Sequence, residues 1–185
     1  MRGYVSAIWC PAQNAEDSGR PVLYPDDESD KASSCSLGYS FASSWKPHLM
    51  IQYVLGSGDK NPEDGIHGTF DGLFSGADTV LYGWMNLFFW QNLREFRVDL
   101  VLTPAETLTF RGEYHFFGFD EEKDAWYFPG KAVRKDPTGS SGRRLGHEVD
   151  LTLRKKISGW LEVLNSHVLL EERRDGESLA PLYDP

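Results

Sequence analysis

Charged residues recur at every second position in three segments of the chain. The segments 93–103, 107–117 and 144–156 each alternate polar with apolar residues, a period that is typical of a β-strand with two different faces. The polar positions carry both signs of charge and are Arg97, Asp99, Arg111, Glu113, His115, Glu148, Asp150 and Arg154. Such side chains can select ions, and their arginines can donate paired hydrogen bonds to the carboxylates of an acidic solute.

Two of these acids could instead form a catalytic pair. Glu148 and Asp150 are two residues apart, so a strand places them on one face about 7 Å apart. Glycosidases use two carboxyl groups separated by about 5–9.5 Å. This spacing arises easily by chance and nothing else in the sequence supports it, so we expect no catalytic residue.

The run at 59–64 offers oxygen atoms of the calcium-binding type. It lacks the spacing of an EF-hand loop, and a turn at Asn61-Pro62 explains it better. The two cysteines, Cys10 and Cys35, leave a disulfide open because their spacing cannot decide it. We therefore expect no metal site and no cofactor.

The positions between the charges are apolar and often aromatic. In the segment 107–117 they include Leu108, Phe110, Tyr114 and Phe116. A transmembrane β-barrel strand needs this contrast, with lipid outside and water inside. No apolar run approaches the roughly 18 residues of a spanning helix, so only strands could cross a membrane. His147 also falls on the apolar side, where we expect it near the membrane rim.

Loop lengths alternate along the chain. Short turns are expected at 44–47, 104–106 and 157–159, and long loops at 56–79 and 118–141. Outer-membrane barrels show this pattern, with short periplasmic turns and long extracellular loops. Counting the aromatic-dense segment 80–90, we expect about seven strands.

Composition limits the remaining possibilities. The 185 residues suffice for one domain, and their net charge of -9 disfavours a nucleic-acid partner. We expect residues 1–34 to be irregular, 35–170 to hold the strands and 171–185 to be a charged, disordered tail. The N-terminus has no convincing signal peptide. Six aromatic residues are expected near strand ends, either in membrane girdles or in ordinary packing: Tyr82, Trp84, Trp90, Trp126, Tyr127 and Trp160.

Six blocks of sequence resemble the alginate export family of outer-membrane proteins. They are SGDKNPEDG at 57–65, TFDGLF at 69–74, YGWMNL at 82–87, WQNLR at 90–94, DAWY at 124–127 and GHEVDL at 146–151. The resemblance covers residues 35–168. It implies a porin-like, single-chain barrel of roughly eighteen strands. The best known member exports alginate, an anionic polysaccharide, through an arginine-lined constriction.

The resemblance sets our expectations. The fold class is all-β: an antiparallel up-and-down transmembrane sheet of about seven strands, part of a larger barrel. We expect a porin-like channel segment in the outer membrane of a Gram-negative-type bacterium, passing anionic polysaccharide or small anionic solutes passively, with lipid outside. Arg97, Arg111 and Arg154 would contact the anion. Asp99, Glu113, His115, Glu148 and Asp150 would be their polar partners.

Some alternatives stay open. Seven strands cannot close a wide pore. We therefore expect a C-terminal fragment of a longer chain; assembly from several chains and a degenerate copy are the alternatives. A soluble lipocalin-like barrel would place its aromatic residues inside around a ligand and its charges outside. A polysaccharide-active enzyme is a further alternative, supported only by the carboxylate pair.

Overall fold

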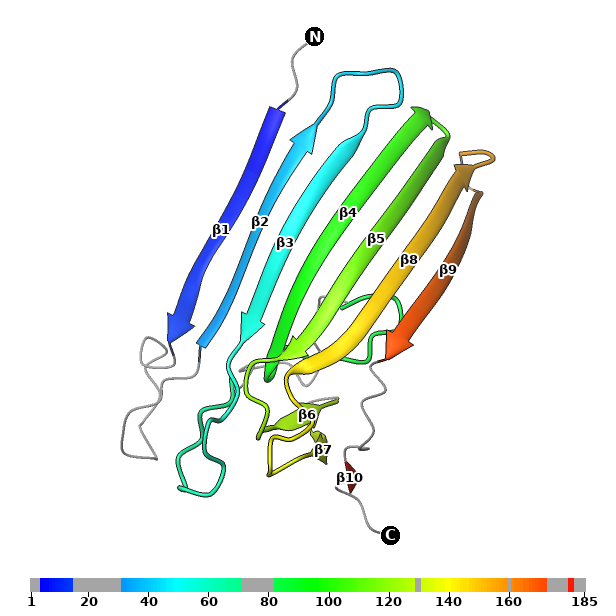
Figure 1. Ribbon diagram of the computed structural model, residues 1–185. Coiled ribbons are helices and arrows are strands. Elements are labelled where there is room, and N and C mark those ends of the chain that lie inside the picture. Colours follow the sequence, from blue (N-terminus) through cyan, green and yellow to red (C-terminus); the bar gives the residue numbers. More distant parts are fainter. Residues whose placement is uncertain are drawn as a thin grey trace.

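The chain folds into two antiparallel sheets (Figure 1). The computed structural model describes residues 4–14, 31–70, 82–128, 131–159, 161–172 and 180–181. The larger sheet has seven strands in the order β1-β2-β3-β4-β5-β8-β9. They are β1 (Tyr4–Asn14), β2 (Lys31–Ser40), β3 (His48–Gly56), β4 (Leu93–Ala105), β5 (Leu108–Phe119), β8 (Arg144–Lys156) and β9 (Glu162–Glu172). The smaller sheet has the order β10-β7-β6, with β6 (Ala125–Tyr127), β7 (Ala132–Lys135) and β10 (Ala180–Pro181).

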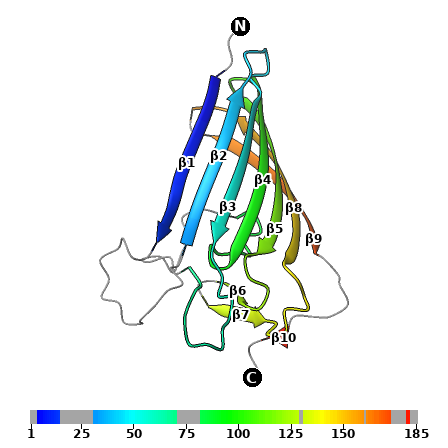
Figure 2. The ribbon, with the colours of Figure 1, turned by 60° about the vertical axis from the view of Figure 1, so that its left-hand side comes forward.

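The all-β, antiparallel fold class is confirmed. Each strand of the large sheet pairs with its neighbour in up-and-down order. Strands β6 and β7 of the small sheet lie between β5 and β8 in the chain, and β10 follows β9. The sheet is curved (Figure 2). In the described residues β1 and β9 are its two edges and do not pair with each other, so the sheet is an open, partial barrel. None of the described residues forms a helix that could cross a lipid bilayer.

The strand register aligns the polar positions of neighbouring strands. In the hairpin of β4 and β5, Arg97 lies opposite His115 and Asp99 lies opposite Glu113. From β5 to β8, the register places Glu113 opposite Asp150. Because directly opposite residues point to the same side of a sheet, the charges of three strands share one face.

Loop lengths are sorted between the two ends of the sheet. The connections at 41–47, 106–107 and 157–161 are short and lie at one end (Figure 1). Backbone bonds close two of them, from Phe41 N to Pro47 O and from Ile157 N to Leu161 O. The long connections β3–β4 and β5–β8 both lie at the other end, which we call the long-loop end. The expected alternation of loop lengths is confirmed.

Three segments differ from the sequence interpretation. The expected strand at 80–90 is wrong for its described part, because residues 82–92 form turns and irregular backbone. Gly83, Asn86 and Asn92 have φ angles of 74°, 47° and 52°, which a strand does not accommodate. Strand β1 and the start of β2 occupy part of residues 1–34, which the composition suggested to be irregular. Residues 171–185 were expected to form a disordered tail, but β9 reaches Glu172 and β10 lies at Ala180–Pro181. The other residues of that tail lie outside the described ranges.

The distribution of side chains is the reverse of that in a water-soluble protein. On β4, β5 and β8, one face holds buried charged residues; we call it the inner face. The opposite, outer face presents large apolar side chains that are one-third to one-half exposed. They are Leu37, Tyr39, Leu49, Ile51, Tyr53, Phe96, Leu100, Phe110, Tyr114, Leu151 and Leu153.

The apolar core is small and lies at the long-loop end. It consists of Val54, Tyr82, Phe88, Leu93 and Phe117. Two of these come from the segment 82–92, which therefore packs against the sheet on the same side as the charged residues. A soluble β-sandwich would also require a buried apolar cluster on the outer face. The described residues form no such cluster there.

Candidate functional site

The inner face gathers most of the residues that the sequence singles out. Glu95, Arg97 and Asp99 come from β4, Arg111, Glu113 and His115 from β5, and Glu148 and Asp150 from β8. The structure thus brings together seven of the eight predicted residues and adds Glu95. Five carboxylates share this face with two arginines and one histidine.

Arg111 neutralises two of the carboxylates. Its Nη2 lies 2.6 Å from Asp99 Oδ2 and 2.9 Å from Glu113 Oε1, and its Nε also donates to Asp99. Arg97 is more remote, with Nη1 3.9 Å from Glu113 Oε1. The Arg111 side chain is 40% exposed and that of Arg97 only 14%, so Arg111 is the more accessible cation.

His115 connects β4 with β8. Its Nδ1 lies 2.7 Å from Glu95 Oε1 in a fully buried pair. On the other side of the ring, Nε2 is 3.4 Å from Asp150 Oδ2 without completing a hydrogen bond. The imidazole ring stacks on Phe117 with the centroids 5.6 Å apart. These contacts fix the ring between two carboxylates.

Backbone amides of the segment 82–92 satisfy the two carboxylates of β8. Trp84 N donates to Asp150 Oδ2 and Met85 N donates to Glu148 Oε1, each at 2.9 Å. Glu148 is 0% exposed and Asp150 is 1% exposed. The pair that could suggest glycosidase chemistry is therefore buried and holds a loop.

Close packing against Glu148 restricts the residue type at position 83. A Cβ atom added at Gly83 would lie 2.4 Å from Glu148 Oε2, and the φ of 74° at Gly83 is itself unfavourable for other residues. The position therefore requires glycine for two independent reasons.

Aromatic residues hold the rest of the segment 82–92. Phe88 packs on Phe117 and Trp126, with centroid separations of 4.3 and 5.5 Å. Trp126 Nε1 donates to Leu87 O and Trp90 Nε1 donates to Leu55 O. For the buried Tyr82 and for Trp126, ordinary packing is thus the correct interpretation and a membrane girdle is wrong. Trp160 lies outside the described residues.

Arg154 is separate from the inner-face network. It lies near the short-turn end of β8, where Nε is 2.9 Å from Glu162 Oε1. Its side chain is 58% exposed. Of the three arginines expected to contact an anion, the structure brings Arg97 and Arg111 together on the inner face and leaves Arg154 apart.

His147 lies on the outer face, as its alternation predicted. It lies opposite Phe116 in the register and near the end of β8 that adjoins the long loops. Its Nδ1 bonds to the Tyr114 hydroxyl, and its Nε2 contacts the Arg144 guanidinium. Both ring nitrogens therefore have polar partners beside the apolar face.

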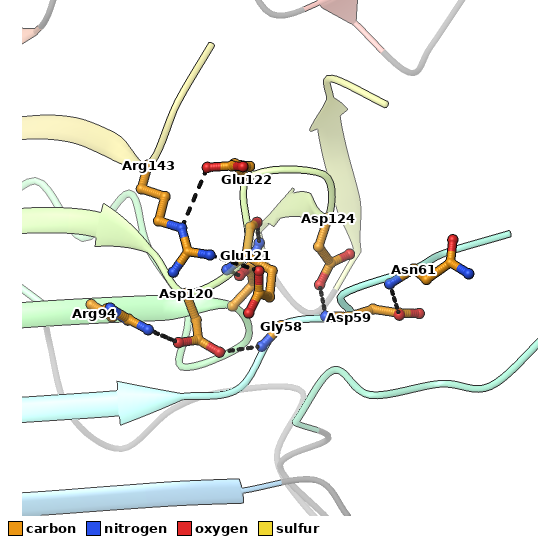
Figure 3. A network of polar contacts seen from close by, with 10 residues as sticks. Gly58, Asp59, Asn61, Arg94, Asp120, Glu121, Glu122, Asp124 and Arg143 are labelled. Carbon is orange, nitrogen blue, oxygen red and sulfur yellow. Dashed lines mark hydrogen bonds and ion pairs between the residues drawn. The ribbon is translucent and has the colours of Figure 1, made fainter. Parts of the chain in front are cut away.

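A second polar network joins the two long loops at their bases (Figure 3). Asp120 accepts from Arg94 Nη2 at 2.6 Å and from Gly58 N at 3.1 Å. Arg143 contacts Glu121 at 2.9 Å and Glu122 at 3.4 Å. Burial raises the pKa of the Glu121 carboxyl, although Arg143 opposes this. We call this network, with Asp124, the loop-base cluster.

Asp124 is the most heavily bonded member of the loop-base cluster. Its carboxylate accepts from Asp59 N at 2.9 Å, Thr69 Oγ1 at 2.7 Å and the Tyr127 hydroxyl at 3.0 Å. Asp124 is itself buried. Burial raises the pKa of Tyr127, and the adjacent Asp124 charge raises it further. The buried Asn92 side chain adds bonds to Glu121 O and Ala125 O at 3.0 Å.

The oxygen-rich run at 59–64 forms a turn. Asn61 N donates to Asp59 Oδ1 at 3.0 Å, and Asp64 N donates to Asn61 O at 3.1 Å. No group of three or more ligating side chains able to hold a metal ion is found among the described residues. Cys35 is a free, exposed cysteine, and the backbone register pairs it with Trp9 rather than with Cys10.

Sequence reasoning missed some of these residues. Glu95 could have been found by extending the alternation of Arg97 and Asp99 two residues back. The donors of Trp84 and Met85 are backbone amides, so no side-chain pattern could reveal them. The role of Asp124 depends on three segments meeting in space and leaves no local signal.

Comparison with known proteins gives one match. The family model described as alginate export matches residues 13–171. Comparisons with curated proteins and with solved structures found no match. The match covers β2 to β8 and all but the last residue of β9. Members of this family are outer-membrane channels, and the family is one of transport proteins rather than enzymes. The curved antiparallel sheet and the family match agree, and the chain belongs to the alginate export family.

Proposed function

We propose that this chain forms part of the wall of an outer-membrane channel that passes an anionic polysaccharide or small anionic solutes passively. One observation carries the proposal: the outer face presents exposed apolar side chains while the inner face buries charged ones. That distribution suits lipid outside and a polar lumen inside. With the sorted loop lengths, it orients the long-loop end toward the cell exterior.

Two alternatives fit the side chains less well. A soluble lipocalin-like barrel needs apolar residues inside and charges outside, the reverse of the arrangement on β4, β5 and β8. An enzyme using Glu148 and Asp150 needs carboxyl groups that a substrate can reach, whereas both are buried and bonded to backbone amides.

Arginine side chains would bias the channel toward anions. Among Arg97, Arg111 and Arg154, the guanidinium of Arg111 is the strongest candidate on the inner face because it is 40% exposed there. Asp99 and Glu113 fix its orientation, as carboxylate partners of an anion-binding arginine do. Asp99, Glu113, His115, Glu148 and Asp150 would otherwise serve as the polar lining.

Planar-bilayer recording tests the arginine roles in the channel that contains this chain. We expect Arg111→Ala to shift the reversal potential in a salt gradient toward cation preference, with smaller shifts for Arg154→Ala and Arg97→Ala. Arg134→Ala on β7, outside the large sheet, is the matched control. If Arg111→Ala and Arg134→Ala gave the same reversal potential, the assigned role would be refuted.

A further inference from the structure

The charges on the inner face do not balance. Arg111 contacts Asp99 and Glu113, and Arg97 lies near Glu113. His115 is closest to Glu95. Even a protonated His115 would therefore leave Glu148 and Asp150 without a full counter-charge, since no lysine or arginine among the described side chains forms an ion pair with either.

The two carboxylates of β8 lie side by side. They accept the amides of the consecutive residues Trp84 and Met85, and both are buried. Each also retains a buried oxygen without a partner, Glu148 Oε2 and Asp150 Oδ1. Two neighbouring buried like charges repel each other strongly. A proton shared between them would remove one negative charge and supply a donor that the pair lacks.

Groups from every packed element affect this pair. Beyond the pair itself, the titratable and charged neighbours are Glu95, Arg97 and Asp99 of β4, Arg111, Glu113 and His115 of β5, and Tyr82 of the segment 82–92. The register places Val168 and Leu170 of β9 opposite Asp150 and Glu148, so the residues of β9 directly opposite the pair are uncharged. Carboxylates outnumber cations in this set, which favours retention of a proton.

We propose that Glu148 and Asp150 form a proton-binding site that positions the segment 82–92 against the inner face. With one proton shared, Asp150 accepts the amide of Trp84 and Glu148 accepts the amide of Met85, and the protonated carboxyl donates to the ionised one. Loss of the proton at high pH leaves two neighbouring buried charges, and their separation displaces the amides that they hold. The segment is then released from β8.

The proposal extends the proposed function, because a segment on the inner face of a channel wall would narrow its lumen. It can fail independently of that function, since the position of the segment is measured without measuring transport. Hydrogen–deuterium exchange of the peptide 82–92, in the lipid-reconstituted chain, reports the bonds at Trp84 and Met85 directly.

The expected result is pH-dependent protection. After correction for the intrinsic exchange rate, raising the pH from about 5 to about 9 should lower protection of the segment 82–92 by at least about tenfold. Glu148→Gln retains a carbonyl acceptor for Met85 N and gains a donor toward Asp150, so its protection should not change with pH. Asp150→Asn offers the same test from the other residue. Glu162→Gln, on β9 far from the pair, should behave like the wild type.

Two glycine substitutions test the position of the segment 82–92 without changing the charge of Glu148 or Asp150. Gly83→Ala would place a Cβ atom 2.4 Å from Glu148 Oε2, so protection should be low at both pH values. Gly65→Ala is the matched control, since Gly65 also has a positive φ of 80° but has no atom within 4 Å of an added Cβ. Wild-type protection that does not change with pH, or variants at 148 and 150 that retain the wild-type pH dependence, would overturn the proposal. A Gly83→Ala protein as protected as Gly65→Ala would also overturn it.

Discussion

At the scale of single residues, the chain uses buried carboxylates to hold backbone. Asp124 accepts the amide of Asp59, and Glu148 accepts the amide of Met85. A charged acceptor forms stronger hydrogen bonds than a neutral one, and a loop amide removed from water needs such a partner. The acids of this chain that look like catalytic or metal-binding groups in the sequence thus serve largely to position loops.

Removing the Asp124 carboxylate should release both long loops. Asp124→Ala leaves the amide of Asp59 and the hydroxyls of Thr69 and Tyr127 without their acceptor. Each unsatisfied buried group costs about 1–3 kcal/mol, so we expect the free energy of unfolding to fall by about 3 kcal/mol or more. Urea denaturation in lipid vesicles measures this.

Limited proteolysis gives the matching local readout. Cleavage should appear within 57–70 and 120–128 in Asp124→Ala. Asp64→Ala is the control, because among the described residues exposed Asp64 accepts only from Ile66, within its own loop. Equal stability of the two variants would show that Asp124 does not join the loops.

At the scale of elements, different hydrogen bonds hold the long strands and the short polar turns. The strands share ladders with their neighbours, whereas the turn at 136–141 depends on one side chain. Asp136 accepts from Thr138 N at 3.0 Å and from Ser141 N at 2.8 Å. These bonds, together with those from the Thr138 and Ser141 hydroxyls, hold the pKa of Asp136 well below its ordinary value of 3.8.

Acid should therefore loosen this turn. Because the folded-state pKa is lowered, the stabilisation is fully present above 3.8 and is lost as the pH falls below it. We expect the amides of Thr138 and Ser141 to exchange faster there, relative to their intrinsic rates. The amide of Gly142, which donates to Gly139 O, is the internal control. If all three amides responded equally, the effect would not come from Asp136.

The elements also show which features can be predicted from sequence. The hairpin of β4 and β5 and its pairing with β8 follow from alternation, because a period of two assigns each residue to a face. The segment 82–92 could not be assigned this way. Its aromatic residues resemble those of a strand, but Gly83, Asn86 and Asn92 adopt positive φ angles. Gly83 packs against Glu148 of β8, and Asn92 bonds to the second long loop. β1 lies in the segment 1–34, which we expected to be irregular, and only its pairing with β2 identifies it.

The candidate site was partly predictable for the same reason. Alternation places Arg97, Arg111 and Glu148 on one face, and the structure agrees. It carries no information on distance along the sheet, so it could not separate Arg154, which pairs with Glu162 at the short-turn end. Neither could it reveal that, among the described residues, the five clustered acids lie with only two arginines.

At the scale of the whole molecule, the two faces of the sheet define two environments. Ile51 and Gln52 are neighbours on β3 and point to opposite faces. Ile51 lies opposite Val98 and is 40% exposed. Gln52 lies opposite Arg97 and bonds to Ser34 Oγ at 3.1 Å. An adjacent pair of positions can therefore report on both environments.

An arginine on each face should have opposite consequences. Ile51→Arg should lower stability in lipid by about 2–4 kcal/mol, the cost of a cation near the middle of a bilayer. Gln52→Arg should cost much less, since the inner face is polar. Folding titrations in vesicles measure the difference. A soluble barrel would tolerate Ile51→Arg and would stay out of the vesicles, so equal stability of the two variants would contradict a lipid-facing outer surface.

The loop-base cluster has a further consequence for how the exposed end of this chain can vary. Among the described residues, the hydrogen bonds that tie the loop at 57–70 to the rest of the molecule come from Ser57, Gly58, Asp59 and Thr69. The hydrogen bonds at 61–66 stay within the loop. The loop tip between Asn61 and Ile66 can therefore accept an inserted peptide, such as an epitope tag, without altering the strands beneath it. In the orientation proposed above, substitutions that change how this surface is recognised from outside the cell can accumulate at the tip while the wall keeps its register.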